Sequence, residues 1–219
     1  MTQLAGQRIV LHGYWRSSSS YRVRIALAWK GVAYEQQPVN LLAGEQRTEA
    51  FGLVAPGGLV PALRIGDRIV VESLAVCELL DELVPEPPLL PSDPFRRSLA
   101  RSMALVVASR IQPFQNLSVL QQVPQTERAG LARKAIEPGL AVLEALVARD
   151  VPAAEGPFCT GAQPTLADVC LVPQLYAARR FSVDLGAYPR LVRADAAARE
   201  LPAFQAAHPD LQPDAIQSA

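Results

Sequence analysis

A cluster of prolines is the feature that most limits how this chain can fold. Within ten residues the sequence carries Pro85, Pro87, Pro88, Pro91 and Pro94. Proline lacks a backbone N–H and fixes φ, so neither a helix nor a central strand can run through this segment. We therefore predict a linker here, with one domain at residues 1–87 and a second at residues 95–219, both of ordinary domain length.

The part before the linker alternates between strand and helix patterns. β-rich apolar runs predict strands at Arg8–Trp15, Tyr34–Val39, Leu59–Ile65 and Arg68–Val71. The last two flank a Gly-Asp pair that is typical of a hairpin turn. Helical patterns lie at about Ser18–Lys30, at Ala43–Phe51 and after Glu72-Ser73. The order β-α-β-α-β-β-α predicts an α/β domain with a mixed sheet and helices on both faces.

The part after the linker carries no comparable strand signal. Helical patterns predict helices at Phe95–Gln121, Glu127–Ala148, Thr165–Arg180, Tyr188–Glu200 and around Ala203. A loop rich in glycine and proline fills residues 151–164. Thr165 is followed three residues later by Asp168, the spacing of a capping box, so we assign Asp168 to folding. The second domain is therefore predicted to be all-α.

Composition excludes several classes of function. Lysine plus arginine total 21 and aspartate plus glutamate total 21, which argues against nucleic acid or an anionic membrane held by bulk charge. No apolar run is long enough to span a bilayer, and the N-terminus lacks a signal-peptide pattern. Three cysteines and two histidines, without metal-ligand spacing, predict no metal site. We expect a cytoplasmic protein with buried, reduced thiols.

The charged residues are uneven in kind. Lys30 and Lys134 are the only lysines, so nearly all positive charge is arginine. Arginine grips a carboxylate in a bidentate way that lysine cannot. An acidic ligand would therefore be bound by a few placed arginines.

Four serines, residues 17–20, stand at the start of the first predicted helix. A sheet of the order above, with a proline opening its third strand, is typical of a thioredoxin-like domain, whose redox cysteines occupy this place. Here no cysteine is present, which excludes disulfide exchange by the protein's own thiols. What remains is a helix N-terminus with a positive dipole end, suited to an anion such as a thiolate from a ligand.

Six segments, in order along the chain, resemble zeta-class glutathione transferases. They are YWRSSSSYRVRIAL at residues 14–27, Val60-Pro61, Glu72-Ser73, IQPFQNLSVL at residues 111–120, DVCLVPQ at residues 168–174 and RFSVDL at residues 180–185. The Val-Pro and Glu-Ser pairs are weak signals alone. The QNLS and LVPQ stretches resemble the members of the class that isomerise maleylacetoacetate. The resemblance implies a thioredoxin-like N-terminal domain followed by an all-helical C-terminal domain, and a homodimer.

The resemblance also implies roles for matching residues at the glutathione site. Ser17 resembles the catalytic serine whose hydroxyl bonds the glutathione sulfur, with Ser18 and Ser19 beside it. Ser20, Tyr21 and Arg22 continue this binding segment. Pro61 resembles a cis-proline that presents the Val60 backbone to the tripeptide. Ser73 resembles the residue that binds the γ-glutamyl carboxylate, Glu72 the residue that meets its amine, and Gln46 a residue near the glycyl end.

Other positions resemble the wall of the active site, and two arginines are further candidates for binding the substrate. Gln112, Asn116, Leu117 and Ser118 are the wall residues, and Arg16 and Arg180 are the candidates for the substrate carboxylates. The family usually has cysteine where this chain has Ser19, which puts chemistry that needs a protein thiol in doubt. Arg110 stands where a small residue is common.

The function implied is glutathione-dependent cis–trans isomerisation of maleylacetoacetate to fumarylacetoacetate, in tyrosine and phenylalanine breakdown. The thiolate would add to the conjugated double bond, the bond would rotate, and elimination would follow. Three alternatives stay open: the same fold acting on maleylpyruvate or α-haloacids, a non-catalytic glutathione-binding protein, and a helical adaptor.

Overall fold

The computed structural model describes residues 4–215. By packing, the chain forms two units: the first runs to Leu89 and resumes at Pro202, and the second spans Leu90–Leu201. This differs from the predicted division at 1–87 and 95–219, because the last segment of the chain joins the first unit. The short helix α10 (Pro202–Ala206) packs against α1 (Ser18–Trp29).

A four-stranded mixed sheet forms the centre of the first unit. Its strands are β1 (Ile9–Gly13), β2 (Glu35–Pro38), β3 (Ala62–Ile65) and β4 (Arg68–Val71), in the order β2-β1-β3-β4. β1 pairs in parallel with β2, while β1–β3 and β3–β4 are antiparallel. The apolar run of β1 is buried because the strand lies inside the sheet and both faces are covered.

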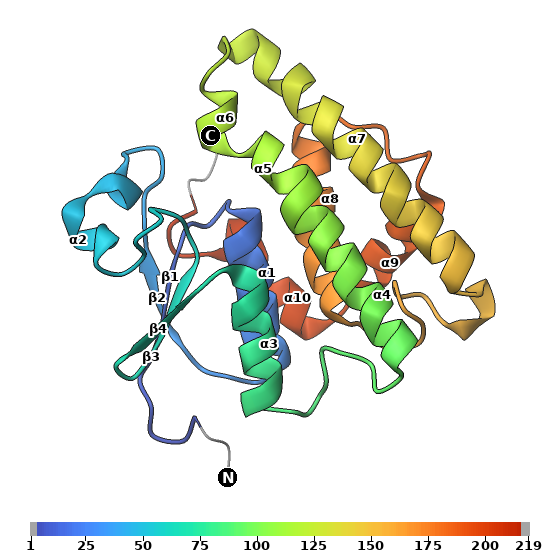
Figure 1. Cartoon of the computed structure of the whole chain (residues 1–219), viewed down its shortest axis with the longest axis horizontal. Coiled ribbons are helices and arrows are strands. Elements are labelled where there is room, and N and C mark those ends of the chain that lie inside the picture. The colour runs from blue at the N-terminus through green and yellow to red at the C-terminus, as the bar shows by residue number, and fades with distance from the viewer. Residues whose placement is uncertain (1–3, 216–219) are drawn as a thin grey trace. The chain divides into compact units, whose positions relative to one another are not determined.

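Helices cover the two faces of this sheet. Figure 1 shows α1 and α3 together on one side of the strands and α2 on the other. The bounds are α3 (Ser73–Leu83), the 3-10 turn η1 (Glu45–Arg47), α2 (Glu49–Gly52) and the 3-10 turn η4 (Pro209–Leu211). Phe51 of α2 packs into a core cluster with Val39 and Ala62. The thioredoxin-like α/β domain predicted from the sequence is confirmed.

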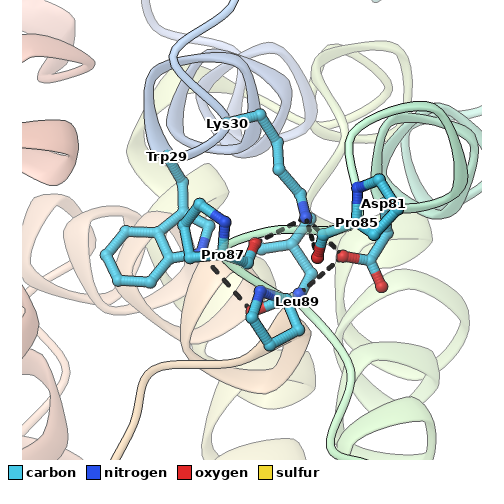
Figure 2. A network of polar contacts seen from close by, with 7 residues as sticks. Trp29, Lys30, Asp81, Pro85, Pro87 and Leu89 are labelled. Carbon is cyan, nitrogen blue, oxygen red and sulfur yellow. Dashed lines mark hydrogen bonds and ion pairs between the residues drawn. The ribbon is translucent and has the colours of Figure 1, made fainter. Parts of the chain in front are cut away.

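A buried lysine binds the proline-rich segment that follows α3 (Figure 2). The Lys30 side chain has no exposed surface, and its Nζ donates to Asp81 Oδ1 at 2.5 Å, to Pro87 O at 2.6 Å and to Pro85 O at 3.4 Å. Asp81 Oδ1 also accepts from Leu89 N at 2.7 Å. A buried charge needs a partner and hydrogen bonds to offset its lost hydration. Here the linker's own carbonyls supply them.

The second unit is built from helices. They are α4 (Pro94–Leu105), α5 (Gln112–Gln115), α6 (Leu117–Leu120), α7 (Gln125–Asp150), α8 (Leu166–Arg180) and α9 (Pro189–Arg199), with a 3-10 turn η3 (Ala153–Glu155). α8 is buried along most of its length and packs against α4 and α9. Of the helices within residues 4–215, none combines the length and apolar character needed to cross a membrane.

One long helix predicted at Phe95–Gln121 is wrong in detail. The structure ends α4 at Leu105 and continues as a π-helical turn, η2 (Val106–Ile111), before the short α5 and α6. Pro113 and the capping Asn116 explain the later breaks. Gly139 of α7 lies against the Ile111 side chain, where any added Cβ would clash, so η2 and α7 approach closely. π-turns of this kind are frequent at functional sites.

Candidate active site

The loop after β1 delivers Ser17 to the start of α1. Ser17 N donates to Tyr14 O at 3.0 Å, which closes a turn, and Ser17 itself is the N-cap with φ −69° and ψ 121°. Its Oγ accepts from Ser20 N at 3.2 Å. No acidic side chain lies in the first turn of α1. The positive end of the helix is therefore not neutralised by a carboxylate of its own first turn.

The serines and their neighbours divide into two sets. Ser17, Ser18 and Ser19 are half-buried. Ser20 is fully buried, and its Oγ accepts from Tyr14 N at 3.3 Å and lies 3.2 Å from where a Cβ on Gly13 would stand. Tyr21 and Arg22, also predicted at the site, are buried too. Ser20, Tyr21 and Arg22 therefore support the helix start from inside the protein. Residues 17–19 lie nearer its surface.

The start of α3 forms a second helix N-terminus in the same unit. Glu72 precedes it with φ 65° and ψ 107°, a conformation that costs a non-glycine residue about 1–3 kcal/mol. Ser73 is buried, and its Oγ accepts from Arg22 Nη1 at 2.5 Å. A side chain of α1 thus binds the first residue of α3. Strained residues of this kind concentrate where ligands are bound.

Strand pairing brings these parts to one end of the sheet. His12 pairs with Ala62, and Ala62 pairs with Val71. Continuing the register by one residue places Pro61 beside Gly13 on one flank and Glu72 on the other. The Val60–Pro61 peptide bond is cis, as expected from the resemblance. The turn before Ser17, the Val60–Pro61 pair and the Glu72–Ser73 pair therefore share one edge.

Gln46 lies close to the loop that leads into this edge. Its backbone carbonyl is 3.0 Å from the position a Cβ on Gly58 would take, and Gly58 has φ of 61°. The side chain is half-buried, and within residues 4–215 its Oε1 has no hydrogen-bond partner. This oxygen is buried, and a buried polar atom without a partner is uncommon in proteins.

The other predicted wall residues lie in the second unit, around α5 and α6. Asn116 caps α6, and its side chain accepts from Ser118 N at 3.3 Å. Gln112 and Leu117 are half-buried, whereas Asn116 and Ser118 are exposed. Gln115 and Gln174, which were not predicted as site residues, exchange two hydrogen bonds of 3.1 and 3.0 Å between their side-chain amides. The sequence feature that could have indicated this pair is the polar Gln174 within the apolar run of α8.

The two candidate arginines each stack on a neighbouring ring. The guanidinium carbon of Arg16 lies 5.1 Å from the centre of the Trp15 ring, and that of Arg180 lies 5.2 Å from the Phe181 ring. Cation–π contacts of this kind hold the long arginine side chain in place. Arg16 belongs to the first unit and Arg180 to the second.

Asp168 is a structural carboxylate, in agreement with its predicted role. It completes a capping box with Thr165, is fully buried, and accepts from Thr165 N at 2.8 Å and Cys159 N at 2.9 Å. Burial raises the pKa of the Asp168 carboxyl, and these backbone donors lower that pKa part of the way. Cys77, Cys159 and Cys170 are all buried.

Comparison with known proteins agrees with this architecture. Residues 11–88 match the family model for the glutathione S-transferase N-terminal domain, and residues 109–213 match that for the C-terminal domain. Maleylacetoacetate isomerase of Mus musculus is 45% identical over 207 residues, which cover 94% of this chain and 94% of the mouse protein.

Two solved structures extend the comparison. A bacterial zeta-class maleyl pyruvate isomerase in its holo form superposes with a TM-score of 0.91 and is 40% identical, covering 94% of this chain and all of its own. Maleylacetoacetate isomerase from Anaeromyxobacter dehalogenans, with dicarboxyethyl glutathione and citrate in its active site, has a TM-score of 0.86 and is 45% identical, covering 97% of this chain and 96% of its own. The chain therefore belongs to the glutathione S-transferase family, within its zeta class.

Proposed function

We propose that this chain is a glutathione-dependent isomerase that converts maleylacetoacetate to fumarylacetoacetate, a step of tyrosine and phenylalanine breakdown. The observation that carries the proposal is the sheet edge that gathers the Ser17 turn, the Val60–Pro61 pair and the Glu72–Ser73 pair. The mouse and Anaeromyxobacter relatives named for this reaction support it.

The residues of this edge fit glutathione. Ser17 Oγ would donate to the sulfur, the Val60 backbone would pair with the peptide, and Ser73 at the start of α3 would hold the γ-glutamyl carboxylate. Glu72 would meet the γ-glutamyl amine, and Gln46 the glycyl end. The strained Glu72 backbone is the feature of this structure that a bound tripeptide would explain.

The helix start can supply the free energy that a thiolate requires. Lowering a thiol pKa from about 9 to about 7 takes roughly 2.7 kcal/mol of preference for the anion. A hydroxyl bond to an anion gives about 1.5–3 kcal/mol. A helix N-terminus adds about 0.3–1 kcal/mol. Ser17 and the first turn of α1, which lacks an acid, are therefore sufficient in magnitude.

Bound glutathione supplies a thiolate that adds reversibly to the conjugated double bond, so that the bond can rotate before elimination restores the trans alkene. The chain's part is to hold that sulfur and the substrate in place. Arg16 and Arg180 would bind the substrate carboxylates, and Gln112, Asn116, Leu117 and Ser118 would line the wall. The side chain of Ser19 would lie beside the sulfur without forming a disulfide.

A second candidate substrate is maleylpyruvate. The bacterial maleyl pyruvate isomerase superposes with a TM-score of 0.91, and both diketo acids present the same conjugated cis double bond next to a carboxylate. Maleylpyruvate is the shorter of the two. The residues that bind the acid part of the substrate therefore decide between them, while the thiolate chemistry is shared. α-Haloacids would use the same thiolate in a displacement.

The deciding experiment offers maleylacetoacetate and maleylpyruvate separately, with and without glutathione, and compares kcat/KM. We expect turnover only with glutathione and a larger kcat/KM for maleylacetoacetate. Uptake of glutathione measured by calorimetry, with no turnover of either acid or of an α-haloacid, would support a non-catalytic binding protein. No uptake at all would end the proposal.

The substrate carboxylate contacts have their own test. Arg180→Met should raise KM for the diacid without weakening glutathione binding, because methionine keeps an unbranched apolar stem and removes the charged guanidinium. Arg16→Met should do the same if it meets a second carboxylate. Equal losses of glutathione and diacid binding would instead indicate a folding defect.

The proposal extends to location and assembly. A cytoplasmic homodimer accords with the resemblance to the zeta class and with the reduced, buried cysteines. Sedimentation equilibrium should give a dimer, and a monomer at micromolar concentration would contradict that part of the proposal.

A further inference from the structure

The segment that follows α10 returns to the loop that carries Ser17. Asp214 Oδ2 accepts from the backbone N–H of Trp15 at 2.9 Å, and its Oδ1 accepts from Gln36 Nε2 at 2.9 Å. One carboxylate thus joins the loop after β1 to β2, and both of its oxygens are used. Asp214 is nearly 200 residues away from Trp15 along the chain, so no local pattern predicts this contact.

The backbone carbonyl of Trp15 is bound by Arg24, which also binds the segment after α10. Arg24 Nη2 donates to Trp15 O at 2.9 Å, and Arg24 Nε donates to Ala207 O at 3.0 Å. Arg24 is buried, and its guanidinium carbon lies 5.3 Å from the centre of the Tyr21 ring, so its position is well determined. The N–H and the C=O of Trp15 are therefore both fixed by groups that bind, or belong to, residues 207–214.

Trp15 lies inside the turn that sets the position of Ser17. The bond from Ser17 N to Tyr14 O closes this turn at 3.0 Å. Moving the Trp15 backbone would move the Ser17 hydroxyl with it. A displacement of about 1 Å at a reacting centre can cost about 100-fold in rate.

We propose that Asp214 is a positioning residue for the thiolate site, and that together with Arg24 it makes the C-terminal segment a clamp on the Ser17 turn. This inference rests on the proposed role of Ser17. Asp214 acts through the Trp15 backbone and does not touch glutathione or the substrate. The clamp fixes where the Ser17 Oγ points before any ligand binds.

The direction in which the thiol pKa of bound glutathione moves in an Asp214 variant distinguishes a positioning role from a purely electrostatic one. Removing a negative charge near the helix start would, by charge alone, favour the thiolate and lower the pKa of bound glutathione. Loss of the clamp misplaces the Ser17 hydroxyl and raises that pKa. Asp214→Ala is therefore expected to raise the pKa and to lower kcat/KM about 10- to 100-fold, mainly through kcat.

Two variants serve as controls. Asp210→Ala removes an exposed carboxylate from the same segment and should leave kcat/KM and the thiol pKa unchanged. Asp214→Asn keeps an acceptor for Trp15 N–H, and its amide can donate to Gln36 once the Gln36 amide turns over. It should restore kcat/KM to within about threefold of the wild type, since the hydrogen bonds rather than the charge do the positioning.

Amide hydrogen exchange in the ligand-free protein tests the clamp without reference to activity. Asp214→Ala should speed exchange at Trp15 and Ser17, and Asp210→Ala should not. Exchange and thiol pKa that match the wild type in Asp214→Ala would overturn the inference. If the wild type takes up no glutathione but Asp214→Ala still exchanges faster than the wild type at Trp15 and Ser17, the proposed function is wrong and the clamp is still supported.

Discussion

Two helix starts in this molecule use similar residues for opposite purposes. α1 is preceded by the N-cap Ser17 and α8 by the N-cap Thr165, and both caps carry a hydroxyl. At α8 the third residue is Asp168, which turns back to accept from Thr165 N, so the helix end is closed by its own carboxylate. At α1 the first turn holds only serines and no acid. Both helices therefore share a hydroxyl cap, but only the start of α8 is closed by an acid, while the start of α1 lacks one.

Removing the closing carboxylate should have the largest effect. Asp168→Ala leaves the buried N–H groups of Thr165 and Cys159 without acceptors, at about 1–3 kcal/mol each. We expect the free energy of unfolding in urea to fall by roughly 2–6 kcal/mol. Activity per folded molecule should persist.

Asp184→Ala is the matched control for that variant, because Asp184 accepts from Gly186 N on an exposed loop. A loss for Asp184→Ala as large as that for Asp168→Ala would show that the capping box has no special role.

Ser17→Ala should have the opposite effect from Asp168→Ala, with a small loss of stability and a large loss of activity. Losing an N-cap costs about 1 kcal/mol of stability. Losing a preorganised donor to an anion costs about 10²–10³-fold in kcat. Glutathione binding should persist with a raised thiol pKa, which a thiolate absorbance titration measures.

Asp93→Ala removes another N-cap, the one that accepts from Arg96 N at 2.8 Å at the start of α4. It should cost similar stability and no activity. A thiol pKa unchanged in Ser17→Ala would remove Ser17 from the mechanism.

Placing an acid in the first turn of α1 should make it resemble α8. Ser19→Asp is expected to raise stability by about 0.3–1 kcal/mol through the helix dipole. It should also lower kcat/KM about tenfold, because a carboxylate beside the sulfur opposes the thiolate. Ser19→Asn keeps the size without the charge and should leave kcat/KM close to that of the wild type. Equal activity of the two variants would mean that the charge of this helix end is unimportant.

The smallest effect is expected from restoring the residue that the family usually has. Ser19→Cys should change isomerisation by less than about threefold, because the reaction uses the thiolate of the ligand. A cysteine at a helix start has a lowered pKa, so this variant should form a mixed disulfide with oxidised glutathione, visible by intact mass. The wild type should form none, since its cysteines are buried. A labelled wild type would show that a native thiol becomes accessible.

Local chemistry explains which elements were predictable. The first helix, expected at Ser18–Lys30, is found at Ser18–Trp29, because its serine cap and glycine stop are both next to it in sequence. The Gly-Asp hairpin and the Thr165–Asp168 box were likewise found. The π-turn at Val106–Ile111 was missed, since nothing in its residues departs from helical periodicity.

Contacts between distant parts of the chain explain what was missed in the site. Asp214 and Arg24 act on Trp15 through tertiary contacts, and their own neighbours in sequence show no pattern. The edge shared by Ser17, Pro61 and Glu72 depends on strand register, which a sequence pattern does not fix by itself. The resemblance named these residues, and the sheet explains why they belong together.

The buried Lys30 has a practical consequence for labelling this protein. Its ammonium is enclosed by Asp81 and the linker carbonyls (Figure 2), so it cannot react with an amine-directed reagent while the protein is folded. Lys134, on α7, is exposed and is the only other lysine. A single fluorophore can therefore be attached to a lysine of the native protein at a known place, and the appearance of a second modified lysine would report that the linker has opened.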